Sequence, residues 1–312
     1  MVDTLGRVLR YYREQNHYSQ GEVCNGLCSV ATLARIEQGE RISDSLLGES
    51  LLGRIGRELS VFELILNEED YQLYKLREQI QTEMVRHDVD TALEQLKKYR
   101  QQMDGSPRLN EQFCLFCEVK CDVTLEKAAD EIKEKALAAL RLTKPQEELW
   151  FTHRQLYTQT EIELLIILLH YDFFAMDEEI EKRLLQLLHF VEQMCSQRKK
   201  DQLGLLIVSE LICCIRHQQN TARALFYIDR AIGFIGKGRG IRQLDRLHFL
   251  RAQMLEKRYC GQLDIVSVKY EIQKECLMAY SICEILDEGE CLAEIEHFCN
   301  EKMQWLITES VM

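Results

Sequence analysis

Residues that break helices are almost absent from this sequence. Only two prolines occur among 312 residues, and no stretch alternates β-branched residues as a strand would. Apolar residues instead recur at the three- and four-residue spacing of amphipathic helices. Because 46% of the residues are hydrophobic, the chain can bury a sizeable core. We therefore expect an all-α protein of roughly two domains.

The segment 19–41 predicts two short helices joined by a tight turn. Ser19 and Glu22 have the spacing of a capping box, a second helix can begin at Ser29, and Gly39 ends it. A helical wheel divides this second helix into an inner face with Val30, Leu33, Ala34 and Ile36 and an outer face with Ala31, Thr32, Arg35 and Gln38. The outer face is free to enter a groove of DNA.

Glu37 falls on the buried side of this helix, where an unpaired carboxylate is costly. The cation expected to pair with it is Arg13, at the edge of the apolar stripe of the preceding helix. The layout of Leu9 to Arg13, then Ser19-Gln20, then Leu33-x-x-Ile36-Glu37-x-Gly39 resembles the phage-repressor-like (Cro/C1, XRE) helix-turn-helix. In that family an arginine of helix one pairs with the glutamate that ends the recognition helix.

The segments 26–33, 52–57 and 62–66 resemble, more narrowly, the Rgg and PlcR (RRNPP) peptide-sensing regulators of Firmicutes. The resemblance implies a five-helix lambda-repressor-like domain at residues 1–66. The expected contacts with double-stranded DNA come from Gln20, Ala31, Thr32, Arg35, Gln38 and Arg41. Arg35 is of the type that reads a base edge, whereas Gln20 and Arg41 are expected to bind phosphates.

The rest of the chain predicts a connecting helix at 67–90 and a repeat domain at 91–312. Amphipathic segments recur there at irregular intervals, which resembles degenerate tetratricopeptide (TPR) repeats. A TPR-like solenoid of helical hairpins is favoured over an irregular bundle. We expect this domain to bind an effector and to form a homodimer.

Charge and hydropathy limit where the protein acts. The net charge is −12, and residues 1–60 hold seven Arg and no Lys against eight Asp and Glu. This weak electrostatic footprint favours two copies binding together to an inverted repeat. The longest apolar run, residues 164–169, is far short of a membrane span, and no signal segment is found. A cytoplasmic protein without membrane contact is expected.

No catalytic or cofactor constellation is found. We interpret the thirteen cysteines, including Cys114, Cys117 and Cys121, as reduced thiols in the core. No disulfide framework or metal site is therefore expected. The glycine-rich segment 236–240 follows a helix and not a strand, which argues against a phosphate-binding loop. An enzyme is not expected.

Two functions remain open from the sequence. In the first, the protein is a sequence-specific transcriptional regulator whose solenoid senses an effector, a short signalling peptide by resemblance. In the second, the solenoid docks another regulator and the N-terminal unit does not read DNA specifically. The first is favoured because the base-reading face accompanies a matched Arg13 and Glu37. Candidate effector-binding residues are Asn110, His153, Arg154, Tyr157, Asn220, Arg251 and Gln253.

Overall fold

A computed structural model describes the protein, and every regular element of its described residues is a helix. The described residues are 4–40, 44–58, 67–103, 105–152, 155–171, 177–217, 220–237, 243–260, 266–287, 289–305 and 307. They form two compact units, within residues 1–196 and 197–312. The predicted all-α class is confirmed. The predicted fifth helix of the DNA-binding domain, at residues 60–66, lies outside the described residues.

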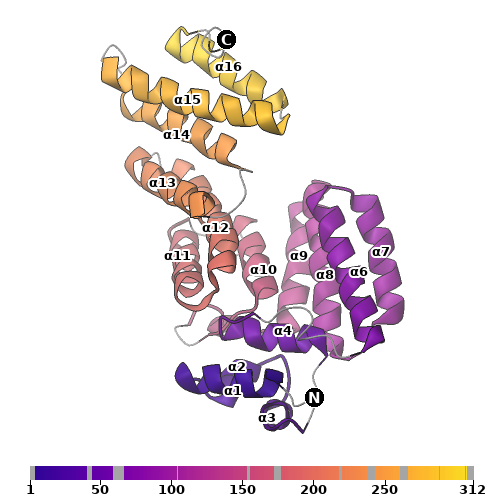
Figure 1. The fold of residues 1–312 in the computed structure, drawn as a ribbon. Coiled ribbons are helices and arrows are strands. Elements are labelled where there is room, and N and C mark those ends of the chain that lie inside the picture. The colour runs from indigo at the N-terminus through magenta and orange to yellow at the C-terminus, as the bar shows by residue number, and fades with distance from the viewer. Residues whose placement is uncertain are drawn as a thin grey trace. The chain divides into compact units, whose positions relative to one another are not determined.

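Three of the four described N-terminal helices begin at polar caps. The four helices are α1 (Thr4–Gln15), α2 (Gln20–Cys24), α3 (Val30–Gln38) and α4 (Ser45–Arg54) (Figure 1), and the polar caps are those of α2, α3 and α4. Ser19 forms the expected capping box with Glu22, and the side chains of Ser29 and Asp44 cap α3 and α4. Gly39 closes α3 with a φ of 75°, in the left-handed region that glycine adopts without steric cost.

The core beneath these helices includes residues from far along the chain. Leu9, Leu33 and Ile36 are at most 1% exposed. Leu109 and Leu156 belong to the same apolar cluster. The N-terminal helices therefore share one core with the helices that follow them in the first unit.

Val30 departs from the inner face predicted for α3, because it is 49% exposed. On the helical wheel it lies about 60° from the centre of the buried stripe made by Leu33, Ile36 and Glu37. It also occupies the first position of the helix, which has no preceding turn to cover it. A residue at the edge of the stripe is thus left in solvent.

The rest of the first unit is a row of helices that pack on their neighbours. They are α6 (Glu68–Val85), α7 (Val89–Gln102), α8 (Pro107–Thr124), α9 (Ala129–Arg141), the short η1 (Glu147–Leu149), α10 (Gln159–His170) and α11 (Asp177–Met194). Helix α6 packs along α7 and α8 along α9 (Figure 1), and further contacts join α7 to α8 and α9 to α10. Since α6 pairs with α7, the expected connecting helix is also the first helix of the row.

The second unit, taken by itself, is also a row of helices. It contains α12 (Gln197–His217), α13 (Thr221–Lys237), α14 (Leu244–Arg258), α15 (Val266–Leu286) and α16 (Gly289–Met303). Each of these helices packs against the next one in sequence. Nearest-neighbour packing is what a helical solenoid requires, and it agrees with the predicted TPR-like class. Among the described helices, none is both long and apolar enough to cross a membrane.

Candidate nucleic-acid interface

Helix α3 is held in place from its inner side. Leu33 and Ile36 are fully buried, and the Ser29 hydroxyl accepts a hydrogen bond from the Thr32 backbone N–H at 3.0 Å. At the other end the Gly39 N–H donates to backbone carbonyls of the last turn. Both ends and one face of the helix are therefore fixed, which leaves the opposite face for recognition.

The ion pair expected between Arg13 and Glu37 is present. Arg13 donates from Nε to Glu37 Oε1 at 2.6 Å and from Nη2 to Oε2 at 2.9 Å, so the pairing is bidentate. Gln20 Nε2 donates to the same Oε2 at 2.8 Å, and Arg13 Nη1 donates to the Tyr18 carbonyl at 3.0 Å. The hydrogen bond with Glu37 raises the pKa of Arg13. A buried carboxylate that would otherwise be destabilising thus connects α1, α2 and α3.

The outer face of α3 remains open. Ala31, Arg35 and Gln38 are exposed, and Thr32 is half-buried with its hydroxyl 2.9 Å from that of Ser29. Within the described residues, the side chain of Arg35 has no hydrogen bond or ion pair. Its five N–H donors are therefore available for a ligand.

Exposed Val30 adds an apolar group at the start of this face. The helical wheel placed Val30 on the inner side, so Val30 was not among the predicted DNA-contacting residues. Apolar side chains in the major groove can contact the methyl group of thymine. Its position at the edge of the buried stripe was the signal that could have identified it.

The two predicted phosphate contacts have different outcomes. Arg41 lies outside the described residues. Gln20 is described, and its side-chain amide donates to Glu37 instead of pointing freely into solvent. This contact gives Gln20 a structural role at the inner side of α3.

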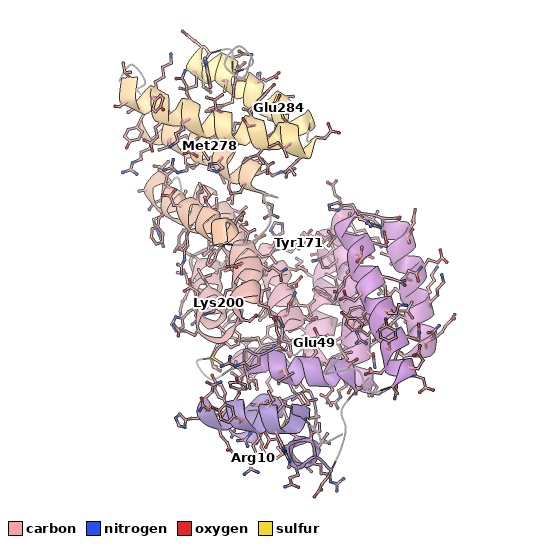
Figure 2. The ribbon with its side chains drawn as sticks, viewed as in Figure 1. Arg10, Glu49, Tyr171, Lys200, Met278 and Glu284 are labelled. Atoms are coloured by element: carbon pink, nitrogen blue, oxygen red, sulfur yellow. The ribbon has the colours of Figure 1, made fainter. Side chains whose placement is uncertain are left out.

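The charge around the helix-turn-helix is nearly balanced. Arg10 projects from α1 into solvent (Figure 2) and pairs with Glu14 at 3.0 Å. The guanidinium carbon of Arg57 lies 3.9 Å from the centre of the Tyr12 ring. Exposed arginines are thus present, but part of their charge is compensated within the unit, as the weak footprint in the sequence indicated.

A second buried arginine joins the helix-turn-helix to the following helices. Arg54, at the end of α4, is 0% exposed and donates to Glu161 of α10 at 2.7 Å. It also donates to the Val23 carbonyl at 3.1 Å and to the Asn25 carbonyl. Burial by itself would raise the pKa of Glu161, but the charges of Arg54 and Lys144 lower it. The carboxylate is therefore held in its charged form, so the pair is ionic.

Two glycines permit close contact at the same junction. Gly26, after α2, has a φ of +75°, and a Cβ there would lie 1.8 Å from the Thr143 carbonyl oxygen. Gly56 has a φ of +70°, and its Cβ would lie 1.5 Å from the Met194 carbonyl oxygen. Helix α4 ends at Arg54, and Gly56 forms the turn after it. Only a residue without a side chain fits at either place.

The candidate effector residues are mostly engaged in the structure. Asn110 is buried, accepts from the Tyr99 hydroxyl and donates to the Ser106 carbonyl, so it stabilises the first unit. Tyr157 is also buried there and donates to the Trp150 carbonyl at 2.9 Å. His153 and Arg154 lie outside the described residues.

The remaining candidates lie in the second unit. Arg251 pairs with Asp229 at 2.7 Å and with Glu275 at 2.8 Å. Asn220 is exposed and accepts from the Arg223 backbone N–H at the start of α13. Gln253 is partly exposed on α14. Arg251 is thus largely neutralised by its own carboxylate partners.

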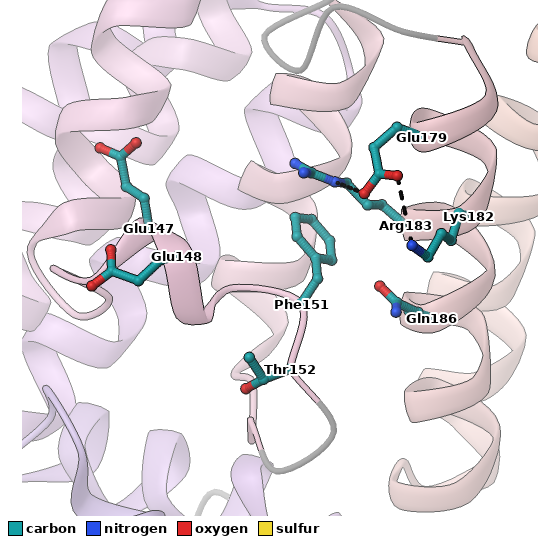
Figure 3. Close-up of a pocket in the computed structure, with 8 residues that line it drawn as sticks. All are labelled: Glu147, Glu148, Phe151, Thr152, Glu179, Lys182, Arg183 and Gln186. Carbon is teal, nitrogen blue, oxygen red and sulfur yellow. Dashed lines mark hydrogen bonds and ion pairs between the residues drawn. The ribbon is translucent and has the colours of Figure 1, made fainter.

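A cavity in the first unit is a further candidate site for an effector. Its volume is about 300 Å³, at the small end of the range for small-molecule sites. Figure 3 shows the lining residues Glu147, Glu148, Phe151, Thr152, Glu179, Lys182, Arg183 and Gln186. The Arg183 guanidinium carbon lies 4.9 Å from the centre of the Phe151 ring, and Arg183 pairs with Glu179 at 3.1 Å. The cavity offers both charges and one aromatic face.

Comparisons with known proteins identify the fold. No protein-family model and no curated protein matches the sequence. PlcR from Bacillus thuringiensis, solved with the peptide PapR7 and DNA, aligns over 93% of this chain and 99% of its own, with a TM-score of 0.54 and 12% identity. This chain has the PlcR fold. The resemblance to the Rgg and PlcR group is thus confirmed at the level of the fold.

Two other solved structures are also similar over nearly the whole chain. The apo competence regulator ComR from Streptococcus vestibularis covers 96% of this chain and 98% of its own, at 14% identity and a TM-score of 0.48. The SHP pheromone receptor Rgg2 from Streptococcus dysgalactiae covers 95% and 99%, at 15% identity and a TM-score of 0.42.

Proposed function

We propose that this protein is a homodimeric transcriptional regulator that reads DNA with α3 and senses a short peptide with its helical repeats. The observation that carries the proposal is the combination of a fixed inner face and an open outer face on α3. Glu37 is bound by Arg13 and Gln20, while the side chain of Arg35 has no partner among the described residues. The fold shared with PlcR, which was solved with a peptide and DNA, supports the same function.

In this proposal each role belongs to one stretch of the chain. Residues 1–66 would read DNA, 67–90 would connect, and 91–312 would bind the effector and dimerise in the cytoplasm. The shared core and the buried Arg54–Glu161 pair connect the part proposed to read DNA directly to α10. A change at α10 would then reach the recognition helix through a short path of buried contacts.

Base recognition would centre on Arg35. A guanidinium can donate two parallel hydrogen bonds to guanine O6 and N7, and Gln38 can bind adenine through its amide. Ala31, Thr32 and Val30 would supply apolar contacts to thymine methyl groups. Arg41 and the N-terminal end of α2 at Gln20 would contact phosphates, which position the helix without selecting sequence.

The peptide part of the proposal places the ligand against the first unit's cavity. Lys182 and Arg183 both pair with Glu179 in this cavity, so its lining suits a peptide mainly through the apolar face of Phe151 and through polar contacts with the peptide backbone. At about 300 Å³ the cavity holds a few side chains of such a peptide and not its full length.

The test is selection of bound duplexes from random DNA with the full-length protein. We expect enrichment of an inverted repeat whose half-sites are about 34–36 Å apart, because two recognition helices related by a two-fold axis require that spacing. A lack of any enriched sequence, with only salt-sensitive binding to all duplexes, would contradict the proposal. That result would favour the docking-module function instead.

A further inference from the structure

Three potential metal ligands meet in the core of the second unit. Asp245 belongs to the first turn of α14, Cys283 to α15 and Cys291 to α16. Their ligand atoms all lie within 4.8 Å of one another. The residues are 1%, 0% and 7% exposed, respectively. They are brought together from three helices and are the one such group among the described residues.

The carboxylate of Asp245 is unusual for a core residue. Its Oδ2 is 3.7 Å from Cys283 Sγ, but its Oδ1 is buried and has no hydrogen-bond partner among the described residues. Buried carboxylate oxygens are normally hydrogen-bonded, paired with a cation or bound to a metal. Thiols are weak donors and do not replace such partners. The unpaired oxygen is therefore a second observation that points to a bound cation.

We propose that Asp245, Cys283 and Cys291 bind a zinc ion through one carboxylate and two thiolates. Tetrahedral zinc with sulfur at about 2.3 Å and oxygen at about 2.0–2.2 Å requires ligand atoms roughly 3.6–3.8 Å apart, which is within reach of the observed cluster. Thiolates select against magnesium and calcium, and the carboxylate favours zinc over copper(I). A solvent ligand completes the fourth position.

Binding would be coupled to loss of protons. Cysteine thiols are protonated at neutral pH unless their surroundings favour the thiolate. Zinc binding forms two Zn–S bonds and one Zn–O bond and releases the two thiol protons to solvent. The filled site then carries one net negative charge. Zinc affinity should rise with pH for this reason.

The same helical hairpin contains a natural control. Cys276 of α15 and Cys299 of α16 form a second buried thiol pair, hydrogen-bonded to each other. That pair is not part of a metal-ligand group in the described residues. It shows what two core thiols look like when they act as small apolar side chains.

The experiment uses the full-length protein, reduced and freed of metal with a chelator. Zinc is titrated in competition with a chromophoric chelator, and cobalt(II) serves as a spectroscopic probe for thiolate ligands. We expect one equivalent of zinc, thiolate-to-cobalt charge-transfer absorption, and a higher melting temperature with zinc. Asp245→Asn and Cys283→Ser should each weaken zinc binding about tenfold or more, whereas Cys276→Ser should not.

Asp245→Asn keeps the shape of the side chain and removes only its charge, so it is expected to fold, and circular dichroism checks this. The proposal is overturned if the native protein does not compete for zinc. It is also overturned if the Asp245→Asn protein keeps its helical circular-dichroism signal and binds zinc with wild-type affinity. A loss of zinc affinity in Cys276→Ser as large as that in Cys283→Ser would overturn it as well. Stoichiometric binding of copper(I) without zinc would reject the assigned metal. None of these outcomes depends on DNA binding.

Discussion

Arg13 is the residue whose loss should most directly disturb the recognition helix. Its bidentate bond to Glu37 is largely shielded, with side-chain exposures of 12% and 3%. Removing one partner of such a pair leaves the other charge buried, so Arg13→Ala should lower the free energy of unfolding by about 3–5 kcal/mol. Urea unfolding of the full-length chain measures this effect.

Glu37→Gln and the double variant complete a cycle for the Arg13 prediction. The double change should cost less than the sum of the single changes, because each single change strands the partner. Arg10→Ala is the control, since the exposed Arg10–Glu14 pair should contribute at most about 0.5 kcal/mol. Equal effects of Arg13→Ala and Arg10→Ala would contradict a structural role for the buried pair.

Lys144 gives a prediction about pH. Burial lowers its pKa to about 8 from the ordinary 10.5, and its ammonium donates to the Leu156 carbonyl at 2.7 Å. Between these two pH values the unfolded chain keeps a proton that the folded chain releases, so stability should rise with pH there. Between pH 8 and 10.5, the free energy of unfolding of the wild-type protein should rise by on the order of 1–3 kcal/mol relative to that of Lys144→Met. A difference between the two proteins that stays constant over this range would be inconsistent with the shift.

At the scale of elements, α3 should carry specificity through one residue. Arg35→Ala should weaken binding to the selected DNA by about 1–3 kcal/mol and have little effect on random DNA, because it removes a base contact and not a phosphate contact. Binding is measured on both duplexes at one salt concentration. Arg86→Ala, an exposed arginine at the end of α6, should change neither affinity. Equal losses on both duplexes for Arg35→Ala would remove the specificity assignment.

The turn after α2 offers a second test at this scale. Gly26→Ala should destabilise the first unit by about 2–5 kcal/mol, since it combines a left-handed backbone with a clash against the Thr143 carbonyl. Gly21→Ala is the matched control, because Gly21 lies within α2 and its nearest neighbour is 3.8 Å away. Gly21→Ala should raise the free energy of unfolding slightly, by up to about 1 kcal/mol. Thermal unfolding of both variants decides between a tight contact at Gly26 and a tolerant loop.

At the scale of the whole molecule, effector and DNA should bind with reciprocal coupling. A short-peptide library screened by thermal stability should yield ligands that change affinity for the selected DNA by about 5–150-fold, or 1–3 kcal/mol. By linkage, the DNA must change peptide affinity by the same factor. A peptide that stabilises the fold at saturation and leaves DNA affinity unchanged would separate sensing from DNA reading and favour a docking function.

Local chemistry was enough to predict the helices and much of the packing of α1, α2 and α3. Ser19 with Glu22, Ser29 and Gly39 act on backbone groups within a few residues, so their roles follow from spacing alone. Glu37 on an apolar face required a cation, and Arg13 was the available one. The outer face of α3 followed from helical periodicity, except at its edge, where Val30 proved exposed.

Contacts between distant segments could not be predicted in this way. The partners Arg54 and Glu161 are 107 residues apart, and Gly26 contacts Thr143, so only packing of the chain reveals why these residues occur where they do. Spacing drew attention to Cys114, Cys117 and Cys121 on one helix, whereas the ligand atoms that converge come from Asp245, Cys283 and Cys291 on three helices. Periodicity determines which side of a helix is buried, and the tertiary structure alone decides which buried groups meet.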